Sequence, residues 1–330
     1  MKKSFYQVDE VIKMIQQGKN LLLSGDEDLL SKLPDGNWIG GTTPYFMTEQ
    51  GGEISRDFIM VDEIPDSAEE VLCKSYDISN IQNVYKDGFE KGFSIIIIPS
   101  ASKVHLSFAL NANEYEGFAT KPLIGWISGL LLDDLNVNTA KTFLKSGNSE
   151  SDSNAVVMHV KLPSSQYAEI SIQNIFKQGN GDVIEFPETT FHVNEAIING
   201  KIKNFAEYVK EMNLDLRLPL VADYSGCMIN ISFQSIDEDK KVVNFYAPVF
   251  KGAIYKQAAP IEDYVRQFEQ LIQNEDNNHI AFSCNCILNF LYSELEGKKT
   301  GNITGPITFG EIAYVLLNQT MVSLEIKNLE

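Results

Sequence analysis

Apolar positions along the first 130 residues alternate between helical spacing and short unbroken runs. The apolar residues within 8–15 lie three or four positions apart, which predicts a helix, and the leucine run 21–23 predicts a buried strand. The isoleucine run 95–98 is β-branched throughout, and such a run is typical of a strand covered on both faces. Residues 101–112 again fit a helix. This alternation predicts a layered α/β fold.

Strand patterns dominate the second half of the chain. The small polar residues of 147–154 predict a loop, and the runs 155–162 and 168–176 after it predict strands. A helix is expected over residues 204–212, where Asn204 is a candidate N-cap. Residues 67–72 have the S/T-x-x-E form of a capping box and predict the start of another helix.

The length of the chain bears on its division into domains. It has 330 residues, which exceeds one ordinary hydrophobic core. We therefore expect an α/β fold of mixed α+β character, with two layered domains whose mixed β-sheets are flanked by helices. The predicted domains are residues 1–175 and 176–330, and the change of pattern allows the boundary to fall anywhere from 150 to 200.

The composition excludes several classes of partner. Lys and Arg number 27 and Asp and Glu number 45, so the net charge is 27 − 45 = −18, which argues against nucleic acid and anionic membranes. The first ten residues lack the apolar run of a signal peptide. The longest apolar runs are far shorter than the roughly 20 residues of a membrane helix. We expect a cytoplasmic protein.

Cysteine and histidine are the residues most often used in metal and redox sites. The four histidines are scattered, and His279, five residues before Cys284, is the nearest approach to a metal cluster. The cysteines are too few and too irregular for a disulfide framework. We expect reduced thiols, no metal and no cofactor. The four cysteines are Cys73, Cys227, Cys284 and Cys286.

Glycine and hydroxyl residues gather at two predicted strand ends. Residues 38–43 and 124–129 both combine glycines with Thr or Ser, a faint internal similarity. Glycine lets another backbone approach closely, and a hydroxyl offers one donor and two acceptors. Strand ends in layered α/β folds are where small ligands bind. Two tight turns with satisfied hydroxyls explain the same residues, and both interpretations stay open.

A second candidate site lies near the C-terminus. Glu311 follows a glycine in the segment 305–312, and a carboxylate at a turn there could receive an ammonium group. Asn318 and Gln319 could hold amide or carboxylate groups of the same ligand. The alternative is structural: Glu311 caps a helix, and residues 318–320 turn into the last strand.

The last third of the chain carries an ordered set of motifs. Phe282-Ser283-Cys284 precedes a predicted helix, and the segments 305–312, with Gly-Glu-Ile, and 317–322, with Asn-Gln-Thr, follow it. This order resembles the end of FIST domains. Residues 198–208 and 123–129 are similar to further segments of that family. Trp126 stands at the family's usual cysteine and Leu130 at its acid, so we expect a divergent member.

The resemblance implies a non-enzymatic, cytoplasmic sensory protein. Such a protein would bind a small polar, amino-acid-like metabolite and signal to a protein partner, with no nucleic acid or membrane as partner and an oligomeric state that the sequence leaves open. No catalytic residue is expected. The residues expected to bind the ligand are Thr42, Thr43, Tyr45, Ser128, Cys284, Glu311, Asn318 and Gln319.

Two other functions stay open. A cysteine-dependent enzyme would use Cys284 or Cys286 with a histidine, although the acidic excess disfavours a thiolate. P-loop, nucleophile-elbow, dinucleotide-binding and H-E-x-x-H motifs are absent from the sequence. A scaffold without a ligand, binding another protein through an apolar patch, is the remaining alternative.

Overall fold

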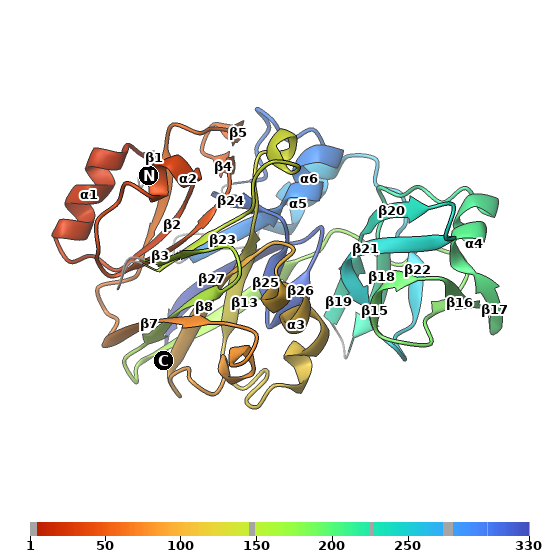
Figure 1. Cartoon of the computed structure of the whole chain (residues 1–330), viewed down its shortest axis with the longest axis horizontal. Coiled ribbons are helices and arrows are strands. Elements are labelled where there is room, and N and C mark those ends of the chain that lie inside the picture. The colour runs from red at the N-terminus through yellow and green to blue at the C-terminus, as the bar shows by residue number, and fades with distance from the viewer. Residues whose placement is uncertain (1–4, 145–148, 225–226, 273–279, 302, 330) are drawn as a thin grey trace.

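The computed structural model describes residues 5–144, 149–224, 227–272, 280–301 and 303–329. It is an α/β fold of mixed sheets flanked by a few helices, as the sequence predicts, with 43% strand and 17% helix (Figure 1). Three six-stranded sheets form a core, and a smaller lobe lies beside it. No helix of the described residues is long and apolar enough to cross a membrane.

The core consists of three repeats. Among the described residues, each repeat contributes six strands, with a helix between the second and third. The first repeat comprises β1 (Phe5–Tyr6), α1 (Val8–Gln16), β2 (Leu21–Gly25), α2 (Glu27–Leu30), β3 (Trp38–Thr42), β4 (Tyr45–Thr48), β5 (Gly51–Ile54) and β6 (Ile59–Glu63).

The second and third repeats follow the same order. The second comprises β7 (Glu70–Tyr76), β8 (Gly92–Pro99), α3 (Lys103–Asn111), β9 (Leu123–Ser128), β10 (Thr142–Leu144), β11 (Ser149–Ser151) and β12 (Ala155–Lys161), with short 3₁₀ turns between. The third comprises β13 (Gln166–Gln173), β23 (Ile280–Cys286), α6 (Ile287–Tyr292), β24 (Gly305–Thr308), β25 (Glu311–Ala313), β26 (Val315–Leu317) and β27 (Met321–Asn328).

The repeats exchange hairpins in a cycle. Each sheet takes four strands from one repeat and a hairpin from another, in the orders β1-β6-β2-β3-β10-β11, β7-β12-β8-β9-β25-β26 and β13-β27-β23-β24-β4-β5. In each repeat one pair of neighbouring strands is parallel, and the second strand of that pair also binds a strand from another repeat. These contacts join β3 to β10, β9 to β25 and β24 to β4. The core therefore has pseudo-threefold symmetry in its strand pairing.

This pairing joins the two domains predicted from the sequence. β9 lies before residue 175 and β25 after it, yet the two strands are hydrogen-bonded neighbours. β4 and β24 likewise share a sheet across that position. The predicted division near residue 175 therefore does not coincide with a boundary between sheets.

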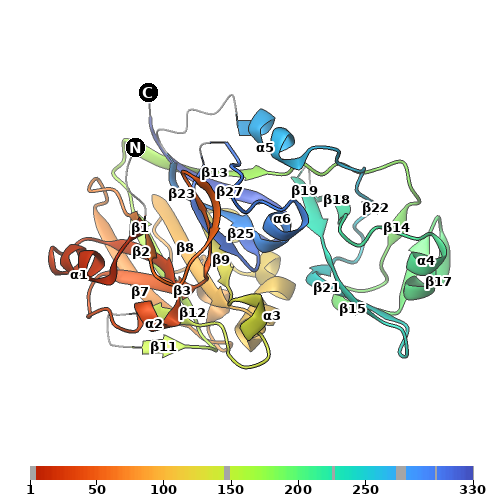
Figure 2. The same cartoon turned by 90° about the horizontal axis from the view of Figure 1, so that it is seen from above.

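The lobe, residues 184–257, is inserted between the first and second strands of the third repeat (Figures 1 and 2). Its aromatic core centres on Phe186, whose ring lies 5.4 Å from those of Phe205 and Tyr255. Its elements are β14 (Ile184–Glu185), β15 (Thr190–Val193), β16 (Glu195–Ile198), β17 (Lys201–Asn204), α4 (Phe205–Glu211), β18 (Leu220–Tyr224), β19 (Cys227–Ile231), β20 (Phe233–Asp237), β21 (Val242–Val249) and β22 (Tyr255–Gln257), and α5 (Tyr264–Ile272) follows the lobe.

Several local predictions are confirmed. The isoleucine run is the buried centre of β8, which has hydrogen-bonded neighbours on both sides. The side chain of Asn204 accepts a hydrogen bond from the backbone N–H of Glu207 and caps α4 as expected. The loop predicted over residues 147–154 is confirmed only in part, because residues 147 and 148 lie outside the described residues and residues 149–151 form the strand β11.

Two local predictions are wrong. Residues 70–76 form the strand β7 rather than a helix, because seven consecutive residues pair with β12 and this long-range pairing outweighs a local capping pattern. The apolar pattern of residues 315–326 also predicts one continuous strand, whereas the structure has two, β26 and β27. The chain breaks at Gln319, whose φ of +49° is incompatible with a continuous strand.

Candidate functional site

Three equivalent strand ends meet inside the core. Each strand end has a residue that pairs with the exchanged hairpin of another repeat, so these residues occupy equivalent positions. They are Gly41, Trp126 and Pro306. Two positions later each repeat carries a hydroxyl that is fully buried. These hydroxyls belong to Thr43, Ser128 and Thr308.

Hydrogen bonds tie these strand ends together. The Thr43 hydroxyl donates to the carbonyl of Ile307 at 2.7 Å, and the backbone N–H of Gly129 donates to the carbonyl of Thr42 at the same distance. The similarity between residues 38–43 and 124–129 therefore has a structural origin, since the two segments occupy the same place in successive repeats.

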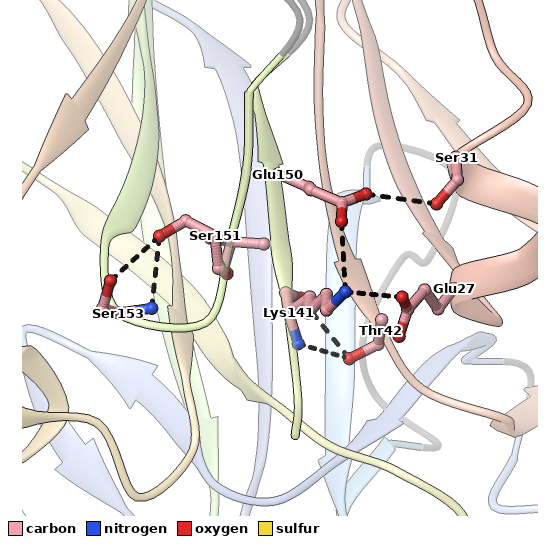
Figure 3. Close-up of polar contacts among 8 residues, drawn as sticks. Glu27, Ser31, Thr42, Lys141, Glu150, Ser151 and Ser153 are labelled. Carbon is pink, nitrogen blue, oxygen red and sulfur yellow. Dashed lines mark hydrogen bonds and ion pairs between the residues drawn. The ribbon is translucent and has the colours of Figure 1, made fainter. Parts of the chain in front are cut away.

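The first of the three junctions is closed by ordinary structural contacts (Figure 3). The hydroxyl of Thr42 accepts a hydrogen bond from the backbone N–H of Lys141 at 2.9 Å. The ammonium of Lys141 lies 2.5 Å from Glu27 and 3.1 Å from Glu150, so charges of opposite sign cover this junction. Its polar groups are occupied by other parts of the chain.

The hairpin residue that pairs with Gly41, Trp126 or Pro306 is of a different chemical type in each repeat. Phe46, Thr142 and Glu311 are equivalent by register. Phe46 packs on Phe5, with ring centroids 4.8 Å apart. Thr142 donates a hydrogen bond to the carbonyl of Asn154 at 2.7 Å. The fold therefore accommodates an apolar ring or a hydroxyl at a position where the third repeat has a carboxylate.

Glu311 is fully buried and only half satisfied. Its Oε2 accepts hydrogen bonds from the backbone N–H of Thr320 at 3.2 Å and from its hydroxyl at 2.9 Å. Within the described residues, its Oε1 has no hydrogen-bond partner. Burial raises the pKa of Glu311 to about 8, although the hydrogen bonds from Thr320 oppose that rise. At neutral pH most molecules hold Glu311 as the neutral acid.

Two thiols lie near this carboxyl group. Cys286 is the N-cap residue of α6, and its side chain makes no capping hydrogen bond. The Sγ of Cys284 donates to the carbonyl of Gly125 at 3.5 Å. Burial, followed by the negative charge of Glu311, raises the pKa of both thiols well above the usual value. Both thiols are therefore protonated at neutral pH.

Other buried polar atoms around Glu311 also lack partners within the described residues. They lie on strand β9, near the end of β23, on α6 and directly after β26. Each such atom costs about 1–3 kcal/mol unless water or a ligand satisfies it. The atoms are Trp126 Nε1, Ser128 Oγ, Asn285 Nδ2, Asn289 Oδ1 and Asn318 Oδ1.

A cleft of about 490 Å³ lies where the lobe, α5 and α6 approach one another. Its lining includes Asp215 and Arg217 from the lobe, Tyr264 from α5 and Tyr292 from α6. Gln319 also lines it, and the next residue, Thr320, holds Glu311. Gln319 is therefore the lining residue that stands next to this contact in the chain, whereas Thr320 and Glu311 are fully buried and do not line the cleft. Figure 2 places α6 on the side of the core that faces the lobe.

The predicted site residues divide into two groups. Ser128, Cys284, Glu311, Asn318 and Gln319 belong to the buried region around the third repeat or border it. Thr42, Thr43 and Tyr45 lie in the first repeat, and the hydroxyl oxygen of Tyr45 accepts from the backbone N–H of Leu132 at 3.1 Å. Their side chains have structural partners, as do those of Cys284 and Gln319.

Several residues of the site were not among those predicted. Trp126, Thr308 and Thr320 lie within the segments singled out from the sequence, so their strand-end position was a usable signal. Arg217 and Tyr264 carry no such signal, because the inserted lobe and α5 reach the site only through the fold. The described residues contain no group of three potential metal ligands, and His279 lies outside them.

Comparison with known proteins finds no match among curated proteins. Nothing in the comparisons links the chain to FIST domains, so that resemblance stays a prediction. A family profile described as a family of unknown function, DUF6976, matches residues 6–327. This match spans all three repeats and the lobe, and the chain belongs to the DUF6976 family.

Proposed function

We propose that this protein binds a small polar metabolite at Glu311 and reports its presence to a protein partner. The ligand enters by the cleft beside Gln319 and Tyr264. In this proposal the protein is a cytoplasmic, non-enzymatic sensor, in line with the resemblance to FIST domains.

The observation that carries the proposal is the difference among the three equivalent positions. Phe46 and Thr142 are satisfied by packing or by a backbone carbonyl, whereas Glu311 leaves one carboxyl oxygen open. Burying a carboxyl group costs free energy that the two other repeats avoid. A polar guest that pairs with Oε1 offsets part of that cost.

The charges of the cleft favour a ligand that carries both signs. Arg217 lines it but is already hydrogen-bonded to Asp215 at 2.8 and 3.0 Å. Lys298 adds a second cation, and Asp263 adds an acid. A zwitterion such as an amino acid presents a carboxylate to the cations and an ammonium group to the acids.

The cysteine-dependent enzyme has less support. A nucleophilic cysteine reacts as the thiolate, and burial raises the pKa of both Cys284 and Cys286. The unpaired Oε1 of Glu311 favours a binding site, because a polar group of a ligand can supply the hydrogen-bond partner that Oε1 lacks.

A thermal-shift screen of amino acids and related small metabolites tests the proposal. A ligand present at 100 times its Kd stabilises the folded protein by about 2.7 kcal/mol. We expect at least one zwitterionic metabolite to raise Tm reproducibly. The absence of any shift across the screen at millimolar concentration would contradict the proposal.

A further inference from the structure

Gln319 connects the core to the inserted lobe. Its side-chain Oε1 accepts a hydrogen bond from the hydroxyl of Ser232 at 2.7 Å, and its Nε2 donates to the carbonyl of Arg217 at 3.0 Å. Its own carbonyl accepts from the side chain of Asn230 at 3.2 Å. All three partners belong to the lobe, so a single core residue holds the lobe through three hydrogen bonds.

The backbone of Gln319 is held in an uncommon conformation. Its φ is +49°, a region that residues other than glycine, Asn and Asp rarely occupy. The side chain is 1% exposed despite bordering the cleft. Strain of this kind costs about 1–3 kcal/mol and persists only where surrounding contacts maintain it. The contacts on the two sides of Gln319 supply that restraint.

Thr320 continues the connection towards the site. It donates two hydrogen bonds to Glu311, as described above. Its carbonyl accepts from the backbone N–H of Cys286 at 3.2 Å and from the side chain of Asn289 at 3.3 Å. Two consecutive residues thus contact the buried carboxyl group on one side and the lobe on the other.

The remaining attachments of the lobe include a polar pair near its entry. Asn174 and Asn230 exchange hydrogen bonds of 2.9 and 3.0 Å at the point where the chain leaves β13. Asn230 also donates to Gln319, so this pair and Gln319 share a partner. A displacement of residues 319–320 therefore changes the hydrogen bonds that hold the lobe, both at the Asn174–Asn230 pair and beside the cleft.

We propose that Gln319 and Thr320 couple the state of the Glu311 site to the attachment of the inserted lobe. Gln319 acts here as a positioning residue, and the lobe is the part of the molecule whose attachment responds. The inference rests on the proposed function, because it supplies the step by which a filled site becomes visible to a protein partner.

Hydrogen exchange measured by mass spectrometry tests the coupling without a ligand. Glu311→Gln changes the acceptor of Thr320, and we expect exchange of the lobe amides at 228–232 to change about tenfold. Gln319→Asn tolerates the positive φ, but its shorter side chain cannot span to both Ser232 and Arg217. In the double variant the effect of Glu311→Gln should fall to less than twofold.

Thr142→Val is the matched control, because it alters the equivalent position, and the side-chain partners of Thr142 among the described residues, Ser151 and Asn154, belong to its own repeat. It should leave exchange at 228–232 unchanged. If Glu311→Gln does not fold, Thr320→Val, which removes one of the two bonds to Glu311, takes its place. An equal lobe response with and without the Gln319 side chain overturns the coupling, as does no response in either background.

The two proposals fail in different ways. A thermal-shift screen without any hit contradicts the proposed function and leaves the exchange result unaffected. A metabolite that binds wild type, combined with a lobe that does not respond to Glu311→Gln, contradicts the coupling alone.

Discussion

Glu311 and Thr142 occupy the same position in different repeats of the core. Glu311 is the register partner of Trp126 in β9, and Thr142 is the register partner of Gly41 in β3. One position holds a buried acid with an open oxygen, and the other holds a hydroxyl with a backbone partner. This pair provides an internal comparison: the fold is common to both positions, and the carboxyl group is not.

The stability of the protein should fall as the pH rises through the range in which Glu311 ionises. Its pKa is about 8 in the folded protein against an ordinary value of 4.5, so the folded state holds one proton more between these values. Below pH 4.5 the stabilisation that results from this difference in pKa is fully present in the free energy of unfolding. It decreases by at most about 1.4 kcal/mol per pH unit up to about pH 8.

Urea unfolding at pH 5 and pH 8 measures this effect, with Glu311→Gln as the comparison. The difference in stability between Glu311→Gln and wild type should shift in favour of the variant at the higher pH. Parallel pH profiles for the two proteins would show that the carboxyl group does not ionise as its burial requires.

His159 should make the protein sensitive to acid. The ring is fully buried, with Nδ1 2.7 Å from the hydroxyl of Ser94 and Nε2 2.9 Å from that of Tyr76. Burial lowers the pKa of His159 from 6.5 to about 4, so below pH 6.5 the unfolded chain binds the extra proton first. Stability should fall by up to about 1.4 kcal/mol per pH unit between pH 6.5 and about pH 4.

Unfolding of His159→Gln over the same range provides the measurement. Its stability should depend less steeply on pH than that of wild type, and the same change at the exposed His192 serves as the control. An unchanged slope in His159→Gln would mean that another group causes the acid sensitivity.

The two cysteines near Glu311 should resist alkylation in the native protein. Both side chains are at most 2% exposed, and burial raises the pKa of each thiol well above its usual value. We expect iodoacetamide at pH 7.5 to label Cys284 and Cys286 at least about 100-fold more slowly than free cysteine. Peptide mapping separates them from Cys227, and urea-unfolded protein is the positive control. Labelling at the rate of free cysteine would revive the enzymatic alternative.

Gly40 in β3 and the equivalent Gly125 in β9 should differ in how much stability is lost when each is replaced by alanine. A Cβ at Gly125 would lie 1.7 Å from the carbonyl oxygen of Ile96, whereas one at the equivalent Gly40 would lie 3.0 Å from that of Leu23. Gly125→Ala should therefore cost about 3 kcal/mol or more, and Gly40→Ala clearly less. Chemical denaturation checks the order, with the open position Gly181→Ala as the control. Equal losses at Gly40 and Gly125 would contradict the close strand approach.

Local patterns predicted much of the secondary structure but not the threefold pairing. Spacing and capping identify α1, α4 and β8 because these signals lie within a few residues. The exchange of β4, β10 and β25 joins residues more than 90 positions apart, and no local pattern specifies such a partner. The same limit explains why β7 was predicted as a helix.

The candidate site was predictable only in part, for the same reason. A carboxylate after glycine and the amides beside it drew attention to Glu311 and Gln319. Their link to Ser232 depends on an inserted lobe that folds back onto the core. The sequence also does not show that Thr142 and Glu311 are equivalent, and it is this equivalence that shows that the fold does not require an acid at this position.

The metabolite screen, run in parallel on wild type, Glu311→Gln and Thr142→Val, tests most directly whether the ligand binds at Glu311. We expect at least one zwitterionic metabolite to raise the Tm of wild type and of Thr142→Val by similar amounts and to leave that of Glu311→Gln unchanged. A metabolite that shifts all three proteins equally, or the lack of any shift in wild type, would contradict the claim that Glu311 is the centre of a ligand site.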